Sequence, residues 1–391
     1  MAIYTITYLI NSIGFFANKR SKKIINCIVL MLLIFISGTR YYLGGTDVLF
    51  YEYLYNSTPT INTVLKYIFT GINNGVDTGH EIGFLLICSI IKQLGFSYFG
   101  FTLLYATLFY ILLYNDIKEF VVNWAPFWAV FMYKIMFYNT FVSLRQGMTI
   151  AIFCYMMKYI RDGKIFKYFA WCIMAFFVHR GALILFPLYF IRYIPVTRDL
   201  IKFTALVFAP TWFFKKYINL GAIINIVISV IGFSDKSSGW GTASESIGVI
   251  HTLECYAVVV MVLIFYNKII SQQNEQDVKL ILRLFLVTIP IFTLFSNWIV
   301  MTREKDYFVL MYGLLFGYIL KGGTTSQLEE TREKISGACR SITGSINAKI
   351  IALVILLICY IGIVKYITGF DGGSLTHFVS FTTKGVSIFA N

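Results

Sequence analysis

The sequence predicts an all-α, polytopic integral membrane protein, because of its composition, its long uncharged runs and the placement of its positive charges. Of the 391 residues, 58% are hydrophobic and only 13% are charged, whereas a soluble domain is about half apolar and about a quarter charged. Residues 24–38 and 350–364 carry no charge at all. A helical membrane span needs roughly 20 mainly apolar residues, so these runs predict transmembrane helices. These runs lack the alternation of apolar and polar residues that is typical of the strands of a transmembrane β-barrel.

Clusters of Lys and Arg indicate which loops stay in the cytoplasm. Anchoring the clusters on the inner face gives a single transmembrane domain, 1–391, with about 12 spans and both termini outside. The predicted spans lie near residues 2–17, 24–38, 97–114, 121–139, 143–160, 166–178, 181–194, 201–219, 250–269, 279–298, 306–320 and 350–368.

Segment 81–95 is apolar but does not fit this alternation. It is short, and a full crossing would place every later basic loop on the wrong side of the membrane. We therefore expect a re-entrant helix, which must be buried in protein, after an outer loop at 39–80. The sequence also predicts an outer loop at 220–250, rich in Gly and Ser, and a cytoplasmic loop at 321–349.

The charge balance points to an anionic ligand and away from nucleic acid. Lys and Arg number 33 against 19 Asp and Glu, a net charge of +14. Basic inner loops account for part of this excess, and no basic stripe interleaved with exposed aromatics predicts nucleic-acid binding. The seven Cys lack a C-x-x-C spacing, and no Walker loop, GxSxG elbow or HExxH motif occurs. The sequence therefore predicts neither a metal nor another cofactor.

Four arginines fall at the outer edges of predicted spans, against the usual inward bias of positive charge. They are Arg40, Arg145, Arg180 and Arg303. Arg145 begins an apolar helix, where positive charge opposes the helix dipole. Because the guanidinium fork suits phosphate oxygens, we interpret the four as a site for a polyanionic group such as a pyrophosphate. The alternatives are snorkelling cations or ion pairs, and acidic neighbours such as Glu304 can neutralise them.

Three residues are candidates for acid–base chemistry. Asp47 ends the run GTRYYLGGTD, whose glycines let backbone approach a ligand closely, although a helix-capping role is the alternative. His179 occupies a tight turn between two apolar segments, and imidazole titrates near neutral pH. A hydrogen-bonded structural histidine is the alternative there. Glu254 lies three residues after His251 and therefore on the same helix face.

Three motifs in succession resemble the EpsG-like branch of the Wzy-type bacterial polysaccharide polymerases. They are GTRYYLGGTDVLFY, SLRQGMTIAI and FFVHRGALI, within a resemblance that extends over roughly residues 25–320. The resemblance implies a glycosyltransferase of the bacterial inner membrane that polymerises O-antigen, capsule or exopolysaccharide repeat units at the periplasmic face. It also implies undecaprenyl-pyrophosphate-linked oligosaccharides and membrane lipid as partners, with a chain-length regulator and a flippase from the same pathway.

The resemblance assigns roles by position. Arg40 and Asp47 match the first Arg-Gly-Asp region of the family, Arg145 matches its second Arg, and His179 matches its His. Arg180 stands where a small residue is expected, and Arg303 matches a later Arg.

The expected reaction is attack of an acceptor hydroxyl on an anomeric carbon, with undecaprenyl pyrophosphate leaving. We expect the arginines to bind the leaving group, and we rank the candidate bases as Asp47, then His179, then Glu254. Three alternatives stay open: an O-antigen ligase, a glycosyltransferase that uses a polyprenyl-phosphate sugar, and a transporter of lipid-linked oligosaccharide. The transporter is the less favoured because the charges gather at one edge and do not line a central pathway.

Overall fold

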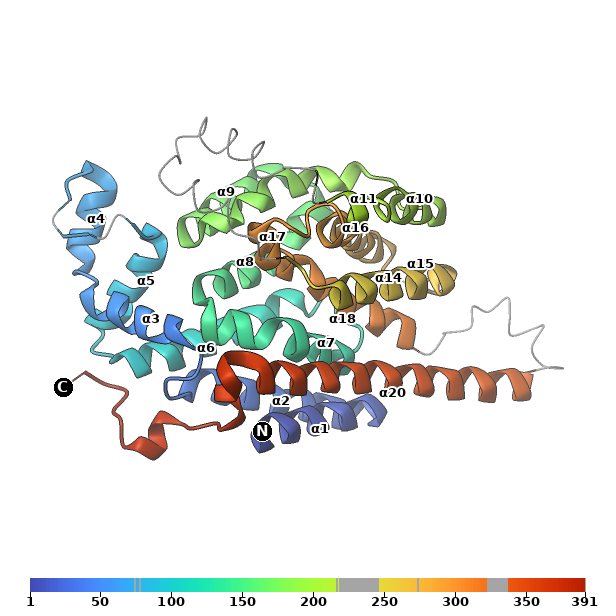
Figure 1. The fold of residues 1–391 in the computed structure, drawn as a ribbon, viewed down its shortest axis with the longest axis horizontal. Helices are drawn as coiled ribbons and strands as arrows, with labels where there is room; N and C mark the ends of the chain where they lie inside the picture. The colour runs from blue at the N-terminus through green and yellow to red at the C-terminus, as the bar shows by residue number, and fades with distance from the viewer. Residues whose placement is uncertain are drawn as a thin grey trace.

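The computed structural model describes residues 1–73, 75–76, 79–215, 217, 246–272, 274–321 and 337–390, and of 337–348 it describes the backbone alone. Within these residues every named element is a helix, and the only β-pairing is two isolated bridges. The all-α prediction is therefore confirmed for the described part of the chain. Most helices run along one common direction and lie side by side (Figure 1).

The N-terminal third contains α1 (Ala2–Phe16), α2 (Lys19–Thr39), α3 (Thr46–Ser57), α4 (Ile61–Thr70), α5 (Ile82–Gln93) and α6 (Tyr98–Ile117). Helices α3 and α4 occupy the stretch 39–80 that the sequence predicted as a loop. Helix α5 coincides with the predicted re-entrant helix. Its 12 residues span only about 18 Å at 1.5 Å per residue, which is too short to cross a bilayer, and its membrane insertion stays a prediction.

The middle of the chain is wound partly as π-helix. Helix α7 (Trp124–Phe131) continues through η1 (Met132–Met136) and η2 (Tyr138–Val142) before α8 (Leu144–Asp162) begins. Short π-helical turns inside helices occur frequently at functional sites. Next come α9 (Ile165–Val178), the 3-10 segment η3 (Arg180–Tyr193), α10 (Arg198–Phe208) and α11 (Thr211–Phe214).

The remaining elements are α14 (Val249–Ile264), α15 (Tyr266–Ile270), α16 (Glu275–Phe292), α17 (Ile299–Glu304), α18 (Asp306–Leu320), α20 (Gly337–Gly369), η4 (Phe370–Thr376) and η5 (Phe381–Lys384). Helix α20 begins at Gly337, so the end of the predicted loop 321–349 is helical. Most of that loop, and most of the predicted loop 220–250, lies outside the described residues. In Figure 1, α20 runs along one side of the molecule next to α1, and the Tyr8 hydroxyl of α1 donates to the Leu356 carbonyl of α20.

Length and composition fit a helical membrane protein. Within the described residues, three helical stretches are long and apolar enough to cross a membrane, namely Lys19–Thr39, Tyr98–Ile117 and Lys349–Thr376, and four shorter apolar helices accompany them. Large apolar side chains also face outward, among them Met31 (56% exposed) and Leu357 (58% exposed). A surface with many such side chains suits lipid better than water. The prediction of about 12 spans remains a prediction.

Candidate active site

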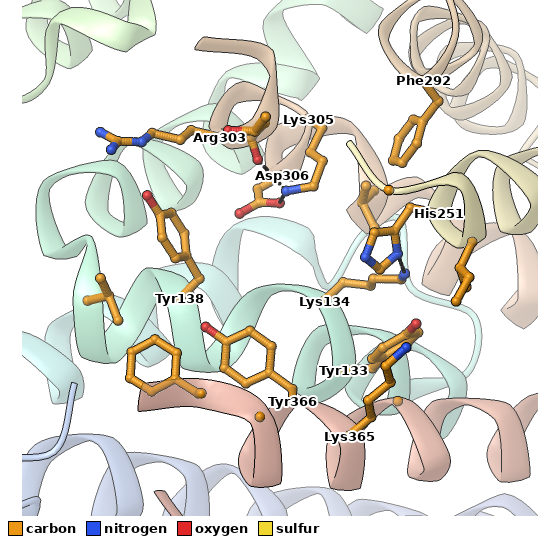
Figure 2. Close-up of a pocket in the computed structure, with 18 of the residues that line it drawn as sticks. Tyr133, Lys134, Tyr138, His251, Phe292, Arg303, Lys305, Asp306, Lys365 and Tyr366 are labelled. Atoms are coloured by element: carbon orange, nitrogen blue, oxygen red, sulfur yellow. Dashed lines mark hydrogen bonds and ion pairs between the residues drawn. The ribbon is translucent and has the colours of Figure 1, made fainter. Parts of the chain in front are cut away.

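A cavity of about 880 Å³ opens between η1, α14, α17 and α20 (Figure 2). We call it the chamber. Its polar and charged lining consists of Asp47, Tyr133, Lys134, Tyr138, His251, Thr302, Arg303, Lys305, Asp306, Lys365 and Tyr366. Its size falls within the range of about 300–1,000 Å³ that is typical of ligand pockets. Figure 2 shows that the labelled side chains come from opposite sides and surround one common space.

Four positively charged side chains line the chamber, and two of them have no counter-charge. Lys134 pairs with Glu254, and the Lys305 ammonium lies 3.1 Å from the Asp306 carboxylate. Arg303 and Lys365 are exposed, and neither forms an ion pair with any residue that the structure describes. Even with the Asp47 carboxylate of the lining counted, the described residues leave the chamber a net positive charge, which favours an anionic ligand.

The π-turn η1 places Lys134 against α14. Its ammonium donates to Glu254 and lies 2.9 Å from Nδ1 of His251. Nδ1 of His251 lies 3.0 Å from the same Glu254 carboxylate, whose other oxygen accepts a hydrogen bond from the Tyr133 hydroxyl. Glu254 is thus held by three neighbours and does not line the chamber. The geometry makes it the counter-ion of Lys134, and it presents no free base to the chamber.

Lys134 was not among the residues predicted from the sequence. The signal that could have found it is its isolation: it is the only charged residue in the stretch 124–142. Ionisable residues inside membrane segments are rare and are usually functional. Its counter-ion lies 120 residues further along the chain, so the sequence alone gave no reason to join the two.

Asp47 lies in the first turn of α3 and lines the chamber. Its side chain is exposed and forms no ion pair or hydrogen bond with the described residues. The two preceding glycines set its position, because Gly44 (φ 136°) and Gly45 (φ 70°) adopt positive φ. A Cβ at Gly44 would lie 2.6 Å from the carbonyl oxygen of Phe141. The glycines that we expected to approach a ligand therefore let this turn pack against η2.

Arg40 does not reach the chamber. Its side chain is buried, with 2% exposure, and its Nε donates to the carbonyl of Leu43 at 3.2 Å. The guanidinium also donates to the carbonyl of Ser37 and lies over the Phe141 ring, 5.1 Å from its centroid. These contacts brace the turn between α2 and α3. The structure thus places Arg40 outside the chamber lining, with its Nη2 buried and without a hydrogen-bond partner among the described residues, and its role as a pyrophosphate ligand stays a prediction.

A second polar cluster, the Glu81 network, lies apart from the chamber lining. Arg145 pairs with Glu81, and its Nε donates to the Tyr51 hydroxyl at 3.3 Å. Nδ1 of His179 lies 3.4 Å from the Glu81 carboxylate, which also accepts the backbone N–H of Arg180 at 3.3 Å. Three residues predicted for the site therefore meet at one carboxylate, and none of the three lines the chamber.

Removal of Arg145 tests whether this ion pair is structural. The carboxylate side chain of Glu81 is only 9% exposed, and removing one partner of a buried ion pair costs about 3 kcal/mol of stability. We expect Arg145→Met to lower the melting temperature in detergent and to reduce polymer yield. The double variant Arg145→Met/Glu81→Gln should regain most of both. A stable double variant that makes no polymer would instead show that Arg145 acts on the substrate.

Glu304 links the two clusters through α17. Arg303 and Lys305 line the chamber, whereas Glu304 between them is turned inward and buried. A Cβ added at Gly181 would clash with the Glu304 carboxylate and lie 2.7 Å from Nε2 of His179. Oε2 of Glu304 has no hydrogen-bond partner among the described residues. Burial, reinforced by the charge of Asp306, raises the pKa of Glu304 to about 8.

The raised pKa of Glu304 makes stability depend on pH. The ordinary value is 4.5 and the folded value about 8, so the folded state holds the proton between these values while the unfolded state has lost it. The free energy of unfolding therefore falls as pH rises through this window and levels off above it. We expect the melting temperature to drop by several degrees between pH 5 and pH 8. Glu304→Gln should remove most of this drop, and an unchanged drop would assign it to other groups.

The family relationship agrees with the motifs. A model of the EpsG family matches residues 3–328, which is most of the chain. The chain belongs to the EpsG family. Neither a curated protein nor a solved structure matches it. Membership of the EpsG family, together with the apolar helices, supports a membrane protein of polysaccharide biosynthesis with a polymerase-type function.

The residues that the EpsG model matches form only part of the chamber lining. It includes Asp47, Lys134, Arg303 and Lys305, whereas Lys365 and all of α20 lie beyond residue 328. One wall of the chamber is thus built by a helix outside the matched part of this EpsG protein.

Proposed function

We propose that this EpsG-family protein is a polysaccharide polymerase of the bacterial plasma membrane. It joins undecaprenyl-pyrophosphate-linked oligosaccharide repeat units into O-antigen, capsule or exopolysaccharide at the outer face. The observation that carries the proposal is the composition of the chamber. Two cations, Arg303 and Lys365, share one cavity with the Asp47 carboxylate, and none of the three has an ion-pair partner in the part of the chain that the structure describes. This arrangement combines an anion site with a base.

The proposed reaction is a single displacement. Asp47 removes the proton from an acceptor hydroxyl, whose oxygen bonds to the anomeric carbon of the growing chain. The bond from that carbon to the pyrophosphate oxygen breaks, and undecaprenyl pyrophosphate leaves with the electron pair. Arg303 and Lys365 stabilise the charge that develops on the leaving group, as preorganised donors do most effectively away from bulk water. Such a displacement inverts the anomeric centre.

The geometry changes the order of the candidate bases. His179 belongs to the Glu81 network and Glu254 is engaged by Lys134, so neither faces the chamber. His251 does line it, and its side chain is 40% exposed. We therefore keep Asp47 first and place His251 second. The expected pathway partners are a flippase that delivers the lipid-linked units and a regulator of chain length.

A deletion strain and a reconstituted reaction test the proposal. Deletion should leave a single repeat unit on the surface lipid, whereas loss of a ligase leaves none and loss of a flippase traps units inside. The purified protein in liposomes, given lipid-linked repeat units, should make polymer and release undecaprenyl pyrophosphate. A deletion strain with normal polymer length would overturn the assignment.

A further inference from the structure

One face of α20 lines two cavities in succession. Lys365 and Tyr366 border the chamber, and Val354 and Ile358 border a second cavity of about 450 Å³. The bordering positions recur every three or four residues from Ile350 to Gly369, as expected for one side of a helix. At about 1.5 Å per residue this stripe is roughly 30 Å long, which is about the thickness of the hydrocarbon core of a membrane.

The second cavity, which we call the apolar groove, has a different lining from the chamber. Helix α14 contributes Ala257, Met261 and Ile264 to its opposite wall. Charged side chains border it only at Lys134 and Glu254, and most of the rest are aliphatic or aromatic. Helices α14 and α20 therefore line a charged cavity toward one end and an apolar cavity toward the other.

Tyr133 and Lys134 border both cavities and form a neck between them. The Tyr133 ring lies against α20 at Gly362, where an added Cβ would clash with it. The hydroxyl of Tyr133 and the ammonium of Lys134 are both fixed by Glu254. The neck thus places the Lys134–Glu254 ion pair at the point where the polar lining gives way to the apolar one.

We propose that the chamber and the apolar groove are one site for an amphipathic anion, with the diphosphate of the substrate in the chamber and the first part of its polyprenyl chain in the groove. The proposal rests on the proposed function for the identity of the head group. The stripe on α20 joins a chamber with unpaired cations to an apolar groove, which matches a substrate with a charged head group and a long apolar tail.

The groove affects orientation more than affinity. A polyprenyl chain that leaves the bilayer for an apolar groove exchanges one apolar environment for another, so it gains little from the hydrophobic effect. A tail held between α14 and α20 instead fixes the direction from which the diphosphate enters the chamber. The groove should therefore matter for substrates that carry a polyprenyl tail and hardly at all for substrates without one.

Photo-crosslinking tests the position of the tail. Benzoylphenylalanine replaces Ile358 in the groove or Leu357 on the adjacent face of the same helix, which is 58% exposed and does not line the groove. The protein is placed in phosphatidylglycerol nanodiscs with undecaprenyl pyrophosphate. We expect labelling of undecaprenyl pyrophosphate to be several-fold stronger at position 358. Equal labelling at both positions, or capture of phosphatidylglycerol alone, would overturn the proposal.

A groove-filling variant separates this inference from the proposed function. Ala257→Trp fills the groove, and Leu253→Trp adds the same side chain to an exposed position on α14 that does not line it. With undecaprenyl-linked units, Ala257→Trp should lower the polymerisation rate about 10-fold, while units linked to a methyl pyrophosphate, which has no tail to enter the groove, should react at the wild-type rate. Equal loss with both substrates, or loss with neither, contradicts the groove assignment. A wild-type protein inactive on both contradicts the proposed function itself.

Discussion

Arg303→Ala is expected to reduce the polymerisation rate by about a hundred- to a thousand-fold, the usual effect of losing one preorganised donor to developing negative charge. Arg303 is exposed to the chamber and has no ion-pair partner among the described residues. Its removal should therefore leave folding and membrane insertion intact. Arg303→Lys keeps the charge but loses the planar fork, so an intermediate rate is expected. The measurement is the initial rate of polymer formation in liposomes.

The matched control for Arg303 is Lys202→Ala. Lys202 is a half-exposed cation on α10, 3.5 Å from Asp199, and does not line the chamber. We expect its removal to leave the rate unchanged. Arg303→Ala with a wild-type rate, at equal protein level, would show that this arginine does not stabilise the leaving group.

Asp47→Asn should lower the rate by about a hundred- to ten-thousand-fold, the range that general-base catalysis contributes. The amide keeps the size of the side chain but cannot accept the proton. Glu52→Gln is the control on the same helix, because Glu52 accepts a hydrogen bond from the Tyr42 hydroxyl at 3.0 Å and does not line the chamber. An active Asp47→Asn protein together with an inactive His251→Gln protein would move the base to His251.

Asp47 and Arg303 could be found from the sequence because each is a charged residue in a segment that the sequence predicts on the outer face, between apolar spans. The all-helical fold followed from the long apolar runs of those spans. Arg40 matched this pattern equally well, but its guanidinium donates to the carbonyls of Ser37 and Leu43 in a tight turn and therefore lies away from the chamber. Which groups a guanidinium meets depends on backbone geometry that local sequence does not specify.

Lys134 and Lys365 are the reverse case, because they line the chamber but were not predicted from the sequence. Both lie within predicted spans, where a single charge is easily read as tolerated. Their role follows from tertiary contacts, since α14 supplies the counter-ion of Lys134 and α20 brings Lys365 to the same cavity. Glu304 was read as a neighbour that neutralises Arg303. The winding of α17 instead turns it away from the chamber and toward Gly181.

The most direct test of the central claim is the affinity of the purified protein for undecaprenyl pyrophosphate. It would be measured for the wild type, for Arg303→Ala/Lys365→Ala and for Lys202→Ala. The chamber assignment predicts that the double variant binds at least about ten-fold more weakly, because it loses two charge-assisted contacts, while Lys202→Ala binds as the wild type does. Unchanged affinity in a folded Arg303→Ala/Lys365→Ala protein would contradict it.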